Sequence, residues 1–211
     1  MSAAGALATA LAITAATGDS RTVAVETAHL ADLFGGGGLG GVSAILGGGV
    51  EVRERPGIPP WGRVKHLPVR GAVFVIVAGA AMPSPSLLGD PHFLARVERA
   101  AAPGLTRLGG QASLSKFLRE AERFTDALRL GPPTVLRRVR ALRAPGTRVA
   151  QAMFGRSLFA WSRTGPARVA LLKHLRRLGL RAVEVPLADR GARVLPEPCP
   201  RRPRLESPLA R

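Results

Sequence analysis

A run of glycines constrains the fold of this chain more than any other feature. Six of the seven residues at positions 35–41 are glycine, and three more follow at 47–49. Glycine allows backbone conformations that other residues disfavour and lets neighbouring groups approach the main chain. Such runs also occur as low-complexity linkers, but apolar helical segments on both sides favour an ordered loop. We therefore expect any active site to lie within residues 28–57.

The pattern of apolar residues predicts a mixture of helices and strands. Helices are expected at residues 3–16, 20–34, 91–102, 113–130, 134–142 and 166–179. Strands are expected at residues 42–46, 50–53, 64–69, 72–77, 182–185 and 192–195, and the run AVFVIV at 72–77 reads as a fully buried strand. Because these elements do not alternate in a strict βαβ rhythm, the expected fold class is α+β.

The net charge of +17 suggests nucleic-acid binding, but the rest of the composition argues against it. Nearly all the basic residues are arginine, which fits a GC-rich coding bias. Tyrosine is absent and aromatic residues make up 4%, so side chains that could stack on bases are scarce. A single cysteine excludes disulfides within the chain, and the four histidines lack zinc-ligand spacing.

The first seventeen residues are small and apolar, but no basic residue precedes them as in a signal peptide. A tightly packed helix explains them better than a membrane span. We therefore expect a cytoplasmic protein with no membrane partner.

Two groups of polar residues flank the glycine run. His29 and Asp32 are three residues apart and share one face of a predicted helix. Arg53 and Arg55 follow the run. From spacing alone, His29 and Asp32 could equally be a surface pair on a helix. Arg53 and Arg55 could equally be ordinary surface charges.

Four landmarks together resemble the archaeal pantoate kinases of the GHMP small-molecule kinase superfamily. MSAAGALATALA is similar to the second GHMP motif, and AHLADLFGGGGLGGVSAILGGGVEVRERPG to the segment that follows it. The serine-containing loop at 83–90 and AQAMFGRSLFA at 150–160 are similar to later landmarks. Their order fits from residue 1 to about residue 161.

The resemblance implies phosphoryl transfer from ATP to the hydroxyl of pantoate, which gives 4-phosphopantoate for coenzyme A synthesis. It implies ATP and Mg²⁺ as cofactors. Nucleotide phosphates are expected at the helix start formed by Ser2, Ala3, Ala4 and Gly5. Ser2 and Asp32 are the implied metal ligands and catalytic residues.

The acceptor pantoate is expected to contact His29 and Arg53. Arg53 could pair its carboxylate bidentately, and Arg55 is the alternative if the alignment shifts. A homodimer is expected, and nucleic acid is not an expected partner.

The implied architecture is a partial GHMP N-terminal domain followed by a ferredoxin-like C-terminal domain. The expected boundaries are 1–69 for the end of the ATP-binding domain, 70–195 for the C-terminal domain and 196–211 for a Pro/Arg-rich tail.

Several positions depart from the family pattern. Asp32 replaces a glutamate, Gly41 stands where the pattern has the presumed catalytic aspartate, and Arg156 replaces an asparagine. Met1 also falls within the second motif. We therefore expect these residues alone to show little kinase activity. The alternatives are a GHMP kinase for another acceptor alcohol and a non-catalytic basic binding protein that keeps part of the fold.

Overall fold

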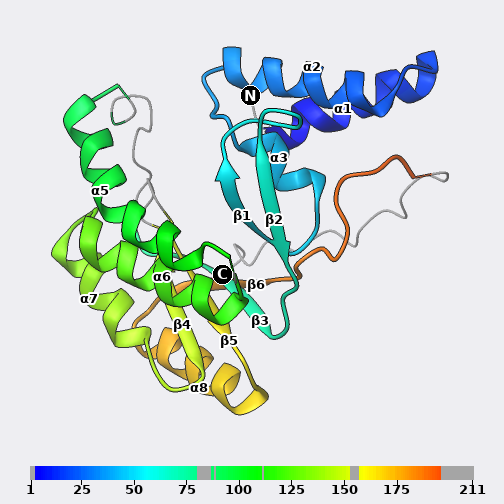
Figure 1. The fold of residues 1–211 in the computed structure, drawn as a ribbon. Coiled ribbons are helices and arrows are strands. Elements are labelled where there is room, and N and C mark those ends of the chain that lie inside the picture. Colours follow the sequence, from blue (N-terminus) through cyan, green and yellow to red (C-terminus); the bar gives the residue numbers. More distant parts are fainter. Residues whose placement is uncertain (1–2, 80–86, 88, 111, 153–156, 196–211) are drawn as a thin grey trace.

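The computed structural model describes residues 3–79, 87, 89–110, 112–152 and 157–195 of the 211. The described residues form two units that lie side by side in Figure 1. The N-terminal unit contains three helices and a two-stranded sheet, and the C-terminal unit contains four helices and a four-stranded sheet. This arrangement confirms the α+β prediction.

The N-terminal unit is built on a pair of contacting helices. Its elements are α1 (Ala3–Thr17), α2 (Arg21–Phe34), α3 (Gly41–Leu46), β1 (Val50–Arg55) and β2 (Arg63–Leu67). The Oγ of Ser20 caps α2 by accepting from the N–H of Val23. Small residues such as Ala6, Ala10, Ala24 and Ala28 form much of the core, so α1 and α2 pack closely.

The prediction of a strand at residues 42–46 is wrong, because these residues form the helix α3. Their apolar pattern is compatible with either element, and the helix is only six residues long. In helical form it buries Val42 and Ser43 against the other two helices. The strand predicted at 50–53 is confirmed as β1, which pairs antiparallel with β2.

The C-terminal unit has the βαββαβ topology of a ferredoxin-like fold. Its elements are β3 (Ala72–Val77), α5 (Pro91–Leu108), α6 (Leu114–Leu128), α7 (Pro133–Leu142), β4 (Thr147–Gln151), β5 (Ser157–Ser162), α8 (Gly165–Arg177) and β6 (Arg181–Val185). The strands lie in the order β4-β5-β3-β6, and every neighbouring pair is antiparallel. The predicted ferredoxin-like architecture is therefore confirmed.

The core of this unit lies on one face of the sheet, where α7 and α8 cover Phe74, Ile76 and Leu158. The prediction that residues 72–77 form a fully buried strand is wrong. Val75 and Val77 point to the other face and are 42% and 61% exposed. The strand alternates in burial because helices pack on one side only.

Two further boundaries differ from the expectation. Helix α5 continues through Pro103 to Leu108 instead of ending at 102. The strand predicted at 192–195 is wrong. Instead, this segment returns to the N-terminal unit, where the N–H of Ala192 donates to Ile45 O at 2.9 Å. None of the described helices has the length and apolar composition needed to cross a bilayer.

Candidate functional site

The glycine run folds back over the end of α2. The N–H of Gly35 donates to Ala31 O at 3.0 Å, and the N–H of Gly37 donates to Asp32 O at 2.8 Å. Between them Gly36 has φ of +81°, a left-handed conformation that favours glycine. The loop is therefore ordered, and it passes directly against Asp32.

The loop and α1 approach Asp32 closely. A Cβ added at Gly37 would lie 2.6 Å from Asp32 Cγ, and one added at Gly41 would lie 2.7 Å from Asp32 Oδ2. The same added atom at Gly41 would lie 2.5 Å from the Cβ of Ala3 at the start of α1. Residues 3, 32, 37 and 41, distant in sequence, thus meet at one point.

The carboxylate of Asp32 lacks hydrogen-bond donors within the described part of the chain. The residue is 4% exposed and no described N–H or O–H donates to its carboxylate, whose oxygens are not among the fully buried unpaired atoms and so keep some contact with solvent. A largely enclosed carboxylate that no protein group engages is available to a cation. No group of three His, Cys, Asp or Glu residues that could hold a metal occurs among the described residues. A single carboxylate still suits Mg²⁺, which retains waters and takes ligands from substrate phosphates.

Arg53 connects β1 to the same loop. Its Nη2 donates to Gly40 O at 2.8 Å and to Ser43 Oγ at 3.2 Å, and the guanidinium also pairs with Glu51. Ser43 Oγ in turn donates to Gly40 O at 3.1 Å. An added Cβ at position 40 would overlap the Arg53 guanidinium, so glycine there allows Arg53 to approach the loop in this way. Arg53 therefore holds the loop in place whatever else it binds.

Unpaired polar atoms concentrate around this loop. Four buried side-chain N or O atoms in the described residues have no hydrogen-bond partner, and three lie within residues 29–53. These three are His29 Nδ1, Glu51 Oε2 and Arg53 Nε. Buried polar groups are normally satisfied, so each of these atoms is a position that a ligand could satisfy.

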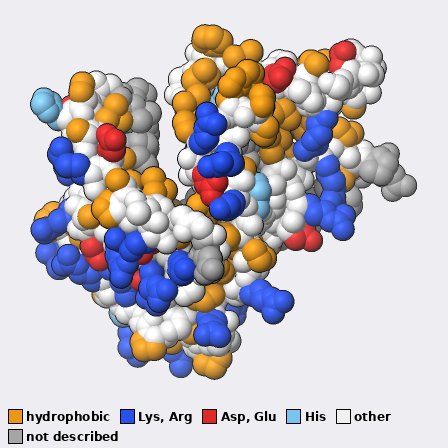
Figure 2. All heavy atoms as spheres, viewed as in Figure 1, with side chains coloured by type: hydrophobic (Ala, Val, Ile, Leu, Met, Phe, Trp, Pro, Cys, Tyr) orange, Lys and Arg blue, Asp and Glu red, His pale blue; other side chains and the backbone are white. Residues whose placement is uncertain are grey.

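A cavity of about 630 Å³ lies beside Arg53, between the β1–β2 sheet and the end of α5. Arg63, Lys65 and Glu54 line it, with Leu105 and Leu108 opposite. Hydrogen bonding from Lys65, assisted by the charges of Lys65 and Arg63, holds the pKa of Glu54 below its ordinary value, against a smaller desolvation effect. Figure 2 shows the surface notched between these two parts of the molecule. The cavity is cationic and large enough for a small acid.

The predicted site residues are only partly brought together. Asp32 and Ala3 meet directly, and Arg53 reaches the adjacent glycine at position 40. Ala4 and Gly5 are exposed on the first turn of α1. Within the described residues, no hydrogen bond or ion pair joins His29 to Asp32 or Arg53. Ser2, the loop at 83–86, Gly155 and Arg156 lie outside the described residues.

Sequence reasoning missed three contributors to the site: Gly40, Ser43 and Glu51. Ser43 could have been found, because a serine inside an apolar run has a reason if the run is a helix and the hydroxyl bonds back to residue 40. Glu51 offered the signal of an acid two residues before an arginine. As neighbours on one face of a strand, the two side chains can pair.

Comparisons with known proteins agree with this geometry. A segment of 66 residues, 31% of this chain, is 47% identical to a pantoate kinase from Thermococcus kodakarensis and covers 22% of that protein. A solved structure described as a phosphotransferase related to the coenzyme A biosynthesis pathway superposes with a TM-score of 0.77 at 26% identity. This superposition covers 90% of this chain and 62% of that one.

Mevalonate kinase from L. major, solved with R-mevalonate, superposes with a TM-score of 0.61 at 16% identity over 83% of this chain and 60% of its own. No protein-family profile matches the chain. The chain thus spans about three fifths of these solved structures.

The fold and the glycine loop define a GHMP-type small-molecule kinase fold. Within that fold the chain is similar to a pantoate kinase over 66 residues and to a coenzyme A-pathway phosphotransferase over most of its length.

Proposed function

We propose that this chain takes part in the ATP- and Mg²⁺-dependent phosphorylation of the pantoate hydroxyl, a reaction that yields 4-phosphopantoate for coenzyme A synthesis. The observation that carries the proposal is the convergence of a donor-free buried Asp32, the start of α1 and the glycine loop. The local identity to a pantoate kinase supports this choice of acceptor.

Asp32 is the residue proposed to hold Mg²⁺. When bound, Mg²⁺ neutralises phosphate charge during phosphoryl transfer. The carboxylate faces Gly41 and Ala3, so a cation at Asp32 would lie near the start of α1. The partial positive charge at a helix N-terminus favours phosphate, and Ala3, Ala4 and Gly5 form the first turn there.

Arg53 is proposed to orient the acceptor through its carboxylate. Its Nη2 is engaged by the loop, and its Nε is buried without a partner. Arg53 is one of the residues that line the cavity beside β1, which has room for a small hydroxy acid. His29, whose Nδ1 also lacks a partner, is proposed as a second acceptor contact.

Gly41 changes the expected chemistry, because glycine cannot accept the proton of the acceptor hydroxyl. Phosphoryl transfer depends mainly on positioning and charge neutralisation, so the absence of a base slows the reaction without forbidding it.

The test combines product formation with ligand-induced stabilisation. The full chain is incubated with ATP, Mg²⁺ and either pantoate or R-mevalonate, and phosphorylated product is measured by mass spectrometry. Thermal unfolding is recorded with each ligand. We expect slow phosphorylation of pantoate and none of R-mevalonate. Pantoate alone should raise Tm, and Mg²⁺ should raise Tm in the wild type but not in Asp32→Asn. Glu26→Gln, an exposed carboxylate substitution on the same helix, serves as the control.

Arg53→Gln is expected to abolish the Tm shift caused by pantoate, whereas Arg55→Gln should retain it, since Arg55 is exposed. The reverse order would assign the acceptor contact to Arg55. Stabilisation by R-mevalonate in place of pantoate would refute the proposed acceptor and favour another GHMP alcohol. A Mg²⁺ response that survives in Asp32→Asn would refute the metal assignment.

A further inference from the structure

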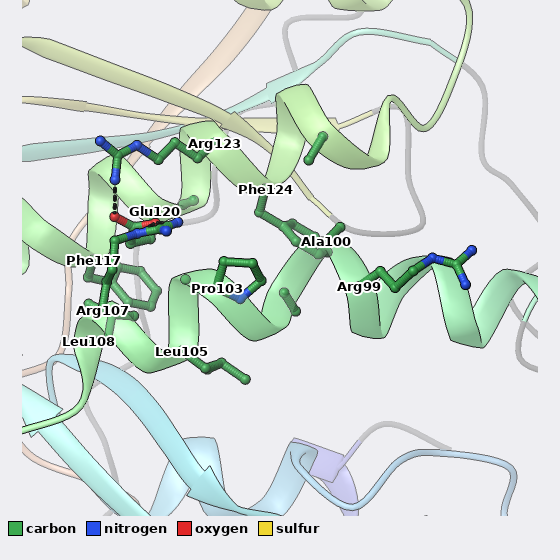
Figure 3. A pocket seen from close by; sticks show the side chains of 14 residues that line it. Arg99, Ala100, Pro103, Leu105, Arg107, Leu108, Phe117, Glu120, Arg123 and Phe124 are labelled. Carbon is green, nitrogen blue, oxygen red and sulfur yellow. Dashed lines mark hydrogen bonds and ion pairs between the residues drawn. The ribbon is translucent and has the colours of Figure 1, made fainter.

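A groove of about 400 Å³ separates α5 from α6, away from the glycine loop. Figure 3 shows Pro103, Phe117 and Phe124 converging on it from the two helices. Apart from one acid and a few arginines its lining is apolar, and the apolar part includes Ala100, Leu105, Leu108 and Ala121. A concave apolar surface of this volume has the size and character of a small-molecule site.

The groove stays open because small residues face each other across the two helices. Ala100 and Gly104 on α5 lie opposite Ala121 on α6, and all three line the space. A Cβ added at Gly104 would lie 3.4 Å from Glu120 Oε2, so the helices approach closely at that end. Leu105 remains 55% exposed beside the groove. Exposed apolar surface of this kind often marks a binding site.

The charges around the groove are unequal. Glu120 is its only acidic lining residue, while Arg99, Arg107 and Arg123 supply three positive charges. Both Glu120 oxygens are occupied: Oε2 accepts from Nε and Nη2 of Arg107, and Oε1 accepts from Nη1 of Arg123 at 2.7 Å.

The remaining guanidinium N–H groups of these two arginines donate to no other described residue, and Arg99 has no partner within the described part of the chain. The acid therefore anchors two cations that keep free donors. An anionic group is the complement to those donors.

We propose that this groove binds a small amphipathic anion, with a short aliphatic or aromatic body between α5 and α6 and a carboxylate or similar acid against Arg107 and Arg123. The apolar lining of the groove would contact the apolar part of the ligand, and the excess of arginine would pair with its acidic group. A neutral or cationic amphiphile would contact the apolar lining but would not pair with the arginines.

A ligand in the groove would alter the cavity of the proposed kinase site. Leu105 and Leu108 line both this groove and the cavity beside Arg53. A ligand that moves either leucine changes the wall of that cavity. Binding in the groove does not depend on the proposed kinase reaction, so it can be tested separately.

Octanoate is a suitable probe, with 1-octanol and octyltrimethylammonium as neutral and cationic analogues. Isothermal titration on the full chain is expected to show one octanoate site with Kd on the order of 1 mM or below. The two analogues should bind about fivefold or more weakly, because they forgo the charged contacts. Sodium acetate at the same ionic strength controls for charge alone.

Three variants locate the site. Ala121→Trp fills the groove from α6 and should abolish octanoate binding. Ala100→Phe fills it from α5 and should do the same, which guards against a folding defect in either variant. Arg123→Gln should weaken octanoate about fivefold and leave 1-octanol unchanged. Arg119→Gln, an exposed arginine on the same helix outside the groove, is the matched control and should change neither.

Equal affinity for octanoate and 1-octanol would overturn the proposal, as would octanoate binding that persists in both filled variants. Absence of saturable octanoate binding to the wild type would also overturn it. Loss of 1-octanol binding in Arg123→Gln would show that the arginine only maintains the shape of the groove. None of these outcomes bears on the metal response of Asp32.

Discussion

Two buried acidic residues, one in each unit, differ in the number of hydrogen-bond donors that the protein supplies to their carboxylates. Glu122 in α6 is 8% exposed and has a full set of donors: its Oε1 accepts from the N–H of Val149, and its Oε2 from Nη1 of Arg148, each at 3.0 Å. Arg143 adds a third contact to this acid. Asp32 in α2 is 4% exposed and has no donor among the described residues.

The difference separates structural burial from functional burial. Glu122 occupies the free edge of β4, where Val149 N–H would otherwise have no partner, so the acid completes the sheet. The carboxylate of Asp32 accepts no hydrogen bond from the described residues. Burial alone is therefore a poor sign of function, whereas a buried acid without partners indicates a ligand.

The largest effect is expected for Glu122→Ala. The substitution leaves the buried Val149 N–H unpaired and removes the partner of Arg148, so the free energy of unfolding should fall by about 3 kcal/mol. Urea unfolding measures it. Asp126→Ala, on the same helix with a half-exposed side chain paired to Arg143, is the control and should cost about 0.5 kcal/mol. Similar losses for both would mean that Glu122 is not distinguished by its buried contacts.

Gly41→Asp tests how tightly the other carboxylate is enclosed. An added Cβ would lie 2.7 Å from Asp32 Oδ2, and the new charge would face the old one, so without metal we expect a loss of about 2 kcal/mol. Added Mg²⁺ should recover part of it, because two carboxylates can share one cation.

Gly38 is the matched control in the same loop, since an added Cβ there meets nothing within 4 Å. Gly38→Asp should change the free energy of unfolding by less than about 0.5 kcal/mol. Equal losses for both variants would show that loop flexibility, and not enclosure of Asp32, sets the cost.

These sites also show what sequence can predict. The long amphipathic helices were predictable from periodicity, and the ferredoxin-like architecture from the family resemblance, whereas β4 and β5 were not predicted as strands. Residues 42–46 were misread because a short, mostly apolar run between glycines fits a strand or a helix equally well. The contact of Gly41 with Ala3 and the hold of Arg53 on Gly40 depend on where the loop passes in space, which residue spacing does not encode.

Asp32→Asn should behave in the opposite way to Glu122→Ala. Without metal we expect a change of less than about 0.5 kcal/mol, or a small gain, because no described donor is lost and a buried charge is removed. With Mg²⁺ at ten times its Kd the wild type should gain about 1.4 kcal/mol and the variant nothing. Urea unfolding with and without Mg²⁺ makes the measurement. A loss of unfolding free energy comparable to that of Glu122→Ala would show that Asp32, like Glu122, stabilises the fold.

The smallest effect concerns Glu120, which is buried like Glu122 but bound by two half-exposed arginines. The hydrogen bond from Arg107, with the charges of Arg107 and Arg123, holds the pKa of Glu120 below its ordinary value of 4.5, against a smaller desolvation effect. A carboxyl with a lowered folded-state pKa adds stability above its unfolded pKa and loses it as pH falls through the folded one.

Wild type should therefore exceed Glu120→Gln in stability by less than about 1 kcal/mol near neutral pH, because the arginines are partly solvated. The gap should narrow as pH falls below 4.5. Urea unfolding at a series of pH values measures this difference directly. A gap that stays constant down to the acid limit would mean that shape and packing, not charge, make Glu120 matter, and Glu120 would then lie outside the contrast between Asp32 and Glu122.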